Sequence, residues 1–395
     1  MTHRFAVIGL ILAAQTLANV GPLGIPAIAS LIRNDLGLTL AQAGSFLSAY
    51  YVGPVLVSIP AGAIADRWGI VTTLAGGQLL IAAGLLAVAG APSYGILIVL
   101  MMIAGAGYGM LNPTSTKAVM AWSRPGERAT MVGFKQVGLP FGGALGAALL
   151  PLLAVAIGWR LAIAVSAVAI AAMGIVTWLL YRDPPATPGT AATRAGGGFS
   201  AVLLTRDLWL LALATGVFAA LQTVCMAFLV LYLHDVVGMP VVAAGRYLAI
   251  AQMSGVAGRI GFGVLSDRVL GGRRRAALAL AGAGSALCSI AMAFTGSGAS
   301  AWWLVPLAIV FGFVGIGWNG VQHTWMAELA GPKAAGTAVG LGLAVSSGGV
   351  MLGPPLFGWL VEAAGGYRPG WIAAAIAMAV GLALLFSVRE RRPAF

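Results

Sequence analysis

Long runs of apolar residues, separated by short polar stretches, dominate this chain of 395 residues. A helix needs about 20 apolar residues to cross a bilayer, and runs of that length are a membrane signature. The pattern predicts an all-α membrane protein with twelve transmembrane helices. We place them at roughly residues 5–32, 39–65, 70–90, 94–122, 129–156, 160–181, 208–233, 240–266, 275–296, 301–328, 334–362 and 369–388. Several are longer than one span requires, which indicates tilt or kinks rather than additional spans.

Composition supports this prediction, since 60% of the residues are hydrophobic and 8% are charged. A net charge of +12 can indicate a nucleic-acid partner, but the placement of the charges argues against one. Of the 22 lysines and arginines, sixteen fall in segments on the side of the N-terminus and four on the opposite side. By the positive-inside rule, we expect both termini of this multi-pass membrane protein in the cytoplasm.

A polar stretch at residues 182–207, with three prolines and a run of glycines, divides the chain in the middle. We predict an N-terminal bundle of six helices at 1–181, a cytoplasmic linker at 182–207 and a C-terminal bundle at 208–395. The two halves repeat short motifs at an offset near half the chain. The repeated pairs are Gly62-Ala-Ile-Ala-Asp66-Arg67 with Gly263-Val-Leu-Ser-Asp267-Arg268, and Gly158-Trp159-Arg160 with Gly366-Tyr367-Arg368. A parallel repeat of this kind is typical of transporters that bind substrate between two halves.

The repeated loop motif gives the chain a resemblance to the major facilitator superfamily that covers nearly its whole length. Its first copy is Gly62, Asp66, Arg67 and Gly69, and its second copy is Gly263, Asp267 and Arg268. In that family these loops lock the inner ends of the two halves in the outward-open state. The resemblance therefore implies two pseudo-symmetric six-helix bundles and a gating role for these seven residues. The alternative is an ordinary ion pair at each helix end.

Arg259 interrupts the apolar stretch 249–265. An arginine near the bilayer centre costs about 3 kcal/mol on insertion scales, so it requires a water-filled cavity or a partner. Arg259 lies eight residues before Asp267, about 12 Å along a helix axis. We predict that it binds an anionic substrate; the alternative is a side chain that extends to the inner surface. Residues 258–267 resemble the eighth helix of monocarboxylate and oxalate-type carriers, where the arginine is implicated in carboxylate binding.

Lys135 is the second cation within a predicted helix, about 10 Å along the axis from Arg128. Residues 133–143 resemble the fifth helix of cyanate-type and related organic-anion carriers. In that fold the fifth and eighth helices meet at one seam. We therefore expect Lys135 and Arg259 to converge on one anion, with Gln136 orienting it. A snorkelling or gating lysine is the alternative.

Several uncharged or titratable polar residues also interrupt predicted helices. As further substrate-binding candidates we select Gln15, Asn19, Tyr50, Tyr51, Gln222, Asn319 and His323. Each is otherwise a polar group that stabilises helix packing. His323 has the additional capacity to carry a proton near neutral pH.

The ten acidic residues all fall at predicted helix ends or in loops, which disfavours a carrier of cations. The sequence has no phosphate-binding loop, zinc spacing or hydrolytic triad, so we expect no enzyme activity, cofactor or metal. We predict a monomeric secondary active transporter of a small organic anion, most simply a carboxylate, that works by alternating access. Proton symport and anion exchange both stay open. The alternatives are an exporter of hydrophobic drugs and a membrane receptor or scaffold.

Overall fold

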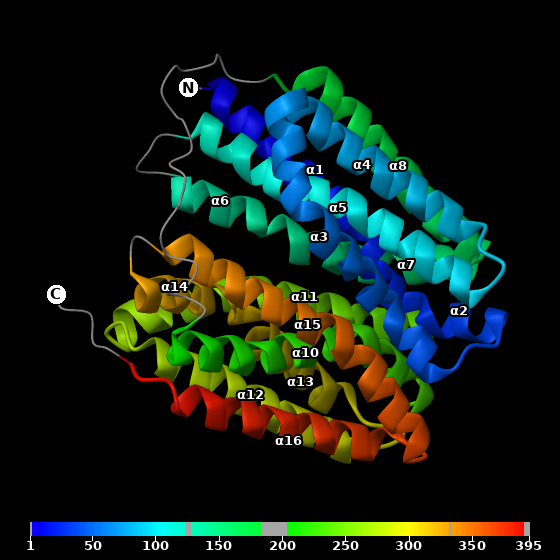
Figure 1. Cartoon of the computed structure of the whole chain (residues 1–395). Helices are drawn as coiled ribbons and strands as arrows, with labels where there is room; N and C mark the ends of the chain where they lie inside the picture. Colours follow the sequence, from blue (N-terminus) through cyan, green and yellow to red (C-terminus); the bar gives the residue numbers. More distant parts are fainter. Residues whose placement is uncertain (1, 124–127, 183–203, 332–333, 391–395) are drawn as a thin grey trace. The chain divides into compact units, whose positions relative to one another are not determined.

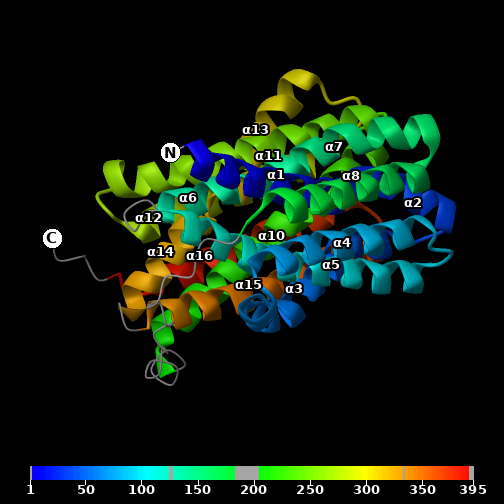
Figure 2. The same ribbon diagram turned by 90° about the horizontal axis from the view of Figure 1, so that it is seen from above.

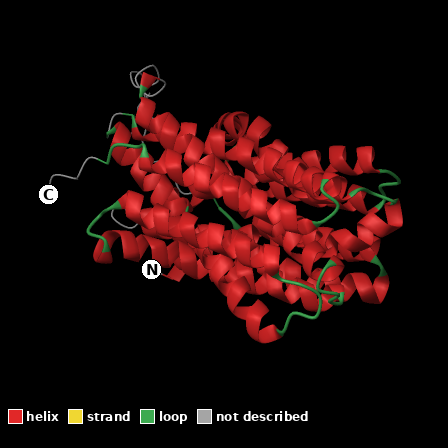
Figure 3. Ribbon diagram, turned by 90° about the horizontal axis from the view of Figure 1, so that it is seen from below, coloured by secondary structure: helices red, strands yellow, loops and turns green. Residues whose placement is uncertain are grey.

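The structure is a computed structural model that describes residues 2–123, 128–182, 204–331 and 334–390 (Figure 1). The described part of the chain is helical, with no strand (Figure 3). Its elements are α1 (Thr2–Gly24), η1 (Ile25–Ile28), α2 (Ala29–Leu36), α3 (Leu40–Trp68), α4 (Ile70–Ala89), α5 (Tyr94–Trp122), α6 (Arg128–Gln136), α7 (Gly138–Ile157), α8 (Trp159–Leu180), α10 (Arg206–Asp235), α11 (Val241–Val264), η3 (Leu265–Val269), α12 (Arg274–Phe294), α13 (Ala301–Gly317), α14 (Asn319–Ala330), α15 (Ala335–Ala363) and α16 (Tyr367–Phe386).

Among the described residues, twelve helical stretches are long and apolar enough to cross a membrane, which confirms the predicted number. Four of these stretches are interrupted: α1, η1 and α2 form one, and α6 with α7, α11 with η3, and α13 with α14 form the others. At the α6–α7 break the cause is Pro140, which has no N–H to donate to the carbonyl of Gln136. The irregular backbone therefore concentrates at a few defined points.

The described chain forms two compact units. The first comprises Met1–Pro188 together with Met239–Ala249, the beginning of α11. Within it, α5 packs against α3 and α4, α1 packs against α7, and α4 packs against α8 (Figure 2). Glycine permits the closest of these approaches: a Cβ on Gly105 of α5 would lie 1.8 Å from the carbonyl oxygen of Tyr50 on α3. Close backbone approach of this kind is the usual basis of helix packing in a bilayer.

The second unit comprises Gly189–Gly238 and Ile250–Phe395. Its central helix is α10, which packs against α15 and α16 and is largely buried. An aromatic cluster supports this core, with Trp371 of α16 in contact with the rings of Tyr232, Phe311 and Phe357 at centroid distances of 4.9 to 6.0 Å. The predicted linker lies mostly outside the described residues, so the predicted domain boundary stays a prediction.

The internal repeat appears as the same type of bond in each unit. In the first unit the indole Nε1 of Trp159 donates to Asp35 at 3.1 Å, joining α8 to α2. In the second unit the hydroxyl of Tyr367 donates to Asp235 at 2.9 Å, joining α16 to α10. Trp159 and Tyr367 are the middle residues of the repeated Gly-aromatic-Arg motif. The motif thus fixes the last helix of each half to the end of the first.

Candidate functional site

Arg259 and His323, 64 residues apart in sequence, lie near each other in the second unit. Arg259 is in α11 and acts electrostatically on His323 of α14. The approach depends on Gly258, where a Cβ would lie 2.3 Å from the carbonyl oxygen of Phe313 and 3.1 Å from the Cα of Gly317. The backbones of α11 and α13 therefore touch, and the start of α14 follows directly. The structure brings together two of the predicted site residues, on different helices.

The break between α13 and α14 at Trp318 is lined with polar side chains. Asn319 donates from Nδ2 to Oε1 of Gln222 at 3.2 Å and to the carbonyl of Ile316 at 3.1 Å. One turn on, Gln322 donates from Nε2 to the hydroxyl of Thr215 at 2.9 Å. These bonds tie the first turn of α14 to α10. Gln222 and Asn319, both predicted as site residues, are thus hydrogen-bonded to each other, whereas Thr215 was not among the predicted site residues.

Two side chains of the second unit, one on α11 and one on α14, retain buried polar atoms without a hydrogen-bond partner among the described residues. These atoms are Nε2 of His323 and both amide atoms of Gln252, whose side chain is fully buried. Gln252 was not among the predicted site residues. Its signal in the sequence was its position seven residues before Arg259, in the same apolar stretch. Buried polar atoms of this kind are uncommon and call for an explanation.

Lys135 lies in the last turn of α6, in the first unit, and is fully buried. Its Nζ donates to Oδ1 of Asn112 at 2.8 Å, to the carbonyl of Asn112 at 3.1 Å and to Oγ1 of Thr116 at 3.0 Å. All three ammonium protons therefore have neutral acceptors on α5. The next residue, Gln136, is half-buried and ends the helix. Lys135 and Arg259 belong to different units, so their convergence on one anion stays a prediction.

The polar residues predicted in the first two spans form a cluster in the first unit. Gln15 donates from Nε2 to the hydroxyl of Tyr108 at 3.3 Å, and Asn19 donates from Nδ2 to the carbonyl of Gln15 at 2.7 Å. The ring of Tyr50 packs 5.8 Å from that of Tyr108 and 5.7 Å from that of Tyr51. The hydroxyl of Tyr50 and Oδ1 of Asn19 are buried without a hydrogen-bond partner in the described part of the chain. Tyr108 was not among the predicted site residues.

The two loop motifs differ in how far the structure describes them. Gly62 and Asp66 lie in α3, but their side chains are outside the described residues, whereas Arg67 is exposed and Gly69 ends the helix with φ of 87°. In the second copy, Asp267 and Arg268 are exposed. A Cβ added to Gly263 would meet no atom within 4 Å, so no close approach requires a glycine there.

Asp267 pairs within its own unit with Arg274, the middle one of three consecutive arginines that follow the motif. Arg274 also donates from Nη1 to Oγ of Ser266 at 2.8 Å and from Nη2 to Glu328 at 2.9 Å. The loop after α11 is thereby fixed to α12 and α14. The gating role of the motif itself stays a prediction.

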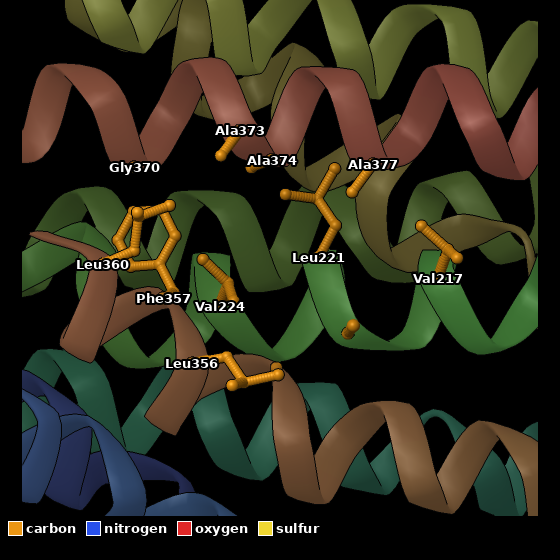
Figure 4. A pocket seen from close by; sticks show the side chains of 12 residues that line it. Val217, Leu221, Val224, Leu356, Phe357, Leu360, Gly370, Ala373, Ala374 and Ala377 are labelled. Carbon is orange, nitrogen blue, oxygen red and sulfur yellow. The ribbon is translucent and has the colours of Figure 1, made fainter.

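An apolar pocket of about 220 Å³ lies between α10, α15 and α16 (Figure 4). Its lining side chains include Leu221, Val224, Leu356, Phe357 and Ala374, and none of the lining residues is polar. It has no group that could neutralise an anion. The pocket is therefore separate in chemistry from the polar residues around Arg259.

The family model of the Major Facilitator Superfamily matches residues 7–347. This chain belongs to that superfamily. The match confirms the predicted family, the membrane-spanning fold and the expectation of a transporter rather than an enzyme. Within the described residues, no group of three histidine, cysteine or acidic side chains is arranged to hold a metal ion.

Among similar proteins of this superfamily, the probable sulfoacetate transporter SauU of Cupriavidus necator is 28% identical, over 97% of this chain and 93% of its own length. The probable anion transporter 5 of Arabidopsis thaliana is 24% identical, over 91% of this chain and 88% of its own. Among solved structures, a bacterial homologue of the human lysosomal transporter Spinster aligns with a TM-score of 0.84 and 19% identity, covering 98% of this chain and 97% of that one. The last comparison supports the fold alone.

Proposed function

We propose that this member of the superfamily is a secondary transporter of a small organic anion, with Arg259 as the main counter-charge of the substrate. The observation that carries the proposal is the distribution of charge along the spans. Each acidic residue in a described helix lies within two residues of that helix's end. Arg259, in contrast, lies five residues inside α11. The interior of the described spans thus contains a positive charge that can neutralise an anion, and no acidic group that could neutralise a cation.

Polar groups of the second unit fit this role. A guanidinium presents a planar fork that matches the two oxygens of a carboxylate or sulfonate. Asn319, Gln222 and His323 lie in the same unit and supply neutral donors and acceptors to the rest of a small ligand. The names of the similar transporters agree with this chemistry, since one refers to sulfoacetate and another to an anion. The substrate class we propose is therefore a small carboxylate or sulfonate.

Transport proceeds by alternating access in this proposal, with the substrate bound between the halves. An empty site is positively charged and costly in a bilayer, so a bound anion offsets that cost and favours occlusion. Lys135 contributes its positive charge to the same anion, and Gln136 helps to orient it. The motifs at Asp66–Arg67 and Asp267–Arg268 close the inner side. The protein acts as a monomer in the inner membrane with both termini in the cytoplasm. The anion moves by proton symport or by exchange.

Thermal unfolding of the purified protein in detergent tests the proposal. A ligand at a hundred times its Kd stabilises the folded state by about 2.7 kcal/mol, which is readily seen as a rise in Tm. We expect this rise with small carboxylates or sulfonates, and neither with organic cations nor with neutral drugs. Arg259→Ala should abolish the rise without unfolding the protein, and Arg259→Lys should restore it only in part. Arg246→Ala, at an exposed position of the same helix, is the matched control and should leave the rise unchanged.

A second candidate, export of hydrophobic compounds, is favoured by one observation, the apolar pocket between α10, α15 and α16. In that case neutral drugs should raise the Tm, and anions should not. An anion-dependent rise that persists in Arg259→Ala would also contradict the proposed role of this arginine.

A further inference from the structure

Gln252 presents an unusual combination of burial and chemistry. Its side chain has 0% relative exposure, and neither its amide nitrogen nor its amide oxygen has a hydrogen-bond partner among the described residues. A buried amide without partners lowers the stability of the folded protein. A neutral apolar side chain of the same size would avoid this cost. Packing alone therefore does not explain why this buried position has an amide side chain.

The position of Gln252 on α11 supplies that reason. Seven residues separate it from Arg259, which corresponds to about two helical turns and places both on nearly the same face. Other faces of α11 are occupied differently: Gly255 and Gly258 touch α13, and Met253 and Ile260 are exposed. Helical side chains lean toward the N-terminus of their helix, and for Arg259 this is the direction of Gln252. One face of the helix thus combines a cation with an unused amide.

A second buried glutamine in the chain shows that burial without hydrogen bonds does not by itself indicate a binding residue. Gln78 of α4 is also fully buried, with both amide atoms unpartnered in the described part of the chain. Its helix contains no charged residue, and its neighbour across the helix interface is Gly174 of α8. Gln78 therefore shares no face with a counter-charge, and it serves as a matched control for Gln252.

We propose that Gln252 binds a second polar group of the substrate whose acidic group is held by Arg259. The substrate class is then a short bifunctional anion, a carboxylate or sulfonate that carries a further acidic or hydroxyl group. The amide nitrogen donates to an oxygen of that second group, and the amide oxygen accepts from a hydroxyl where one is present. This inference rests on the proposed function and adds a residue that selects among anions.

Dissociation constants measured by calorimetry on the purified full-length protein test the inference. The probes are two monofunctional anions, acetate and methanesulfonate, and two bifunctional ones, sulfoacetate and malonate. We expect the wild-type protein to bind a bifunctional anion more tightly. Gln252→Met, which keeps the length of the side chain, should weaken that binding about tenfold and change monofunctional binding less than twofold. It should also raise the Tm of the ligand-free protein, because the unpartnered amide is removed.

Gln78→Met should raise the Tm in the same way and leave every dissociation constant unchanged. If Gln252→Met does not melt cooperatively, Gln252→Leu provides the same readout. An unchanged preference for bifunctional anions in the Gln252 variants, or no such preference in the wild-type protein, overturns the inference while the anion site stands. If no probe binds the wild-type protein, or if all bind Arg259→Ala normally, the proposed function itself fails.

Discussion

The hydrogen bonds of Lys135 lead to a quantitative prediction about the first unit. The perturbation is Asn112→Ala, which removes the side-chain oxygen that lies 2.8 Å from the ammonium. A hydrogen bond to a charged group contributes about 1.5–3 kcal/mol, and a fully buried ammonium has no water to replace the lost acceptor. We therefore expect a loss of about 2–3 kcal/mol in the free energy of unfolding.

The same change should cost much less once the ammonium is absent. In a Lys135→Met background the oxygen of Asn112 has already lost its partner, so Asn112→Ala should cost less than about 1 kcal/mol. The double-mutant cycle then gives a coupling of about 2 kcal/mol. Lys135→Met alone should be close to neutral, because the three hydrogen bonds that it removes are offset by the desolvation cost of a buried charge.

The assay is thermal unfolding of the four proteins in detergent. For 150–250 residues, 1 kcal/mol corresponds to about 2–4 °C in Tm, so Asn112→Ala should lower the Tm by about 4–12 °C. Ser166→Ala is the control: Ser166 of α8 lies in the same unit, donates to the carbonyl of Ile163 and shares no acceptor with Lys135. Its effect should be equal in both backgrounds. An equal loss from Asn112→Ala in both backgrounds would refute the reasoning, since it would show no coupling to the ammonium.

Two further predictions concern the ends of the helices. Arg274→Lys removes the two-pronged contact of the guanidinium with Glu328. Because the carboxylates are partly exposed, we expect the free energy of unfolding to fall by at most about 1 kcal/mol, and by less in high salt. Arg273→Lys, at an exposed neighbouring position, should have no effect on the Tm. For the predicted topology, a cysteine at Ala195 should resist an impermeant thiol reagent in intact cells and a cysteine at Gly238 should react, while labelling of position 195 from outside would contradict cytoplasmic termini.

Hydropathy was sufficient to predict the spans, but not what their side chains contact. In a bilayer the outer face of a span is as apolar as the core, so the sequence carries little signal for which way a helix faces. Arg259 and Lys135 stood out because any charge within a span is costly. Their surroundings depend on helix rotation, and this explains why Asn112, Thr116 and Gln252 were not predicted. The sequence does not show which of the three consecutive arginines at 273–275 pairs with Asp267.

The long spans predict kinks but not the residues at which the helices are interrupted, and these interruptions bear on the proposed function. A proline explains the break beside Lys135, but no proline lies near Trp318. There the side chains of Trp318 and Asn319 donate to the carbonyls of Gly315 and Ile316, at 3.0 and 3.1 Å. Backbone that leaves the helix within a membrane persists only where such partners are supplied. Since Asn319 provides one of them and also bonds Gln222, the group that stabilises the break is also one that we propose for the anion. Asn319 therefore contributes both to the stability of the fold and to the proposed anion site. A substitution at Asn319 should lower the free energy of unfolding and weaken anion binding together.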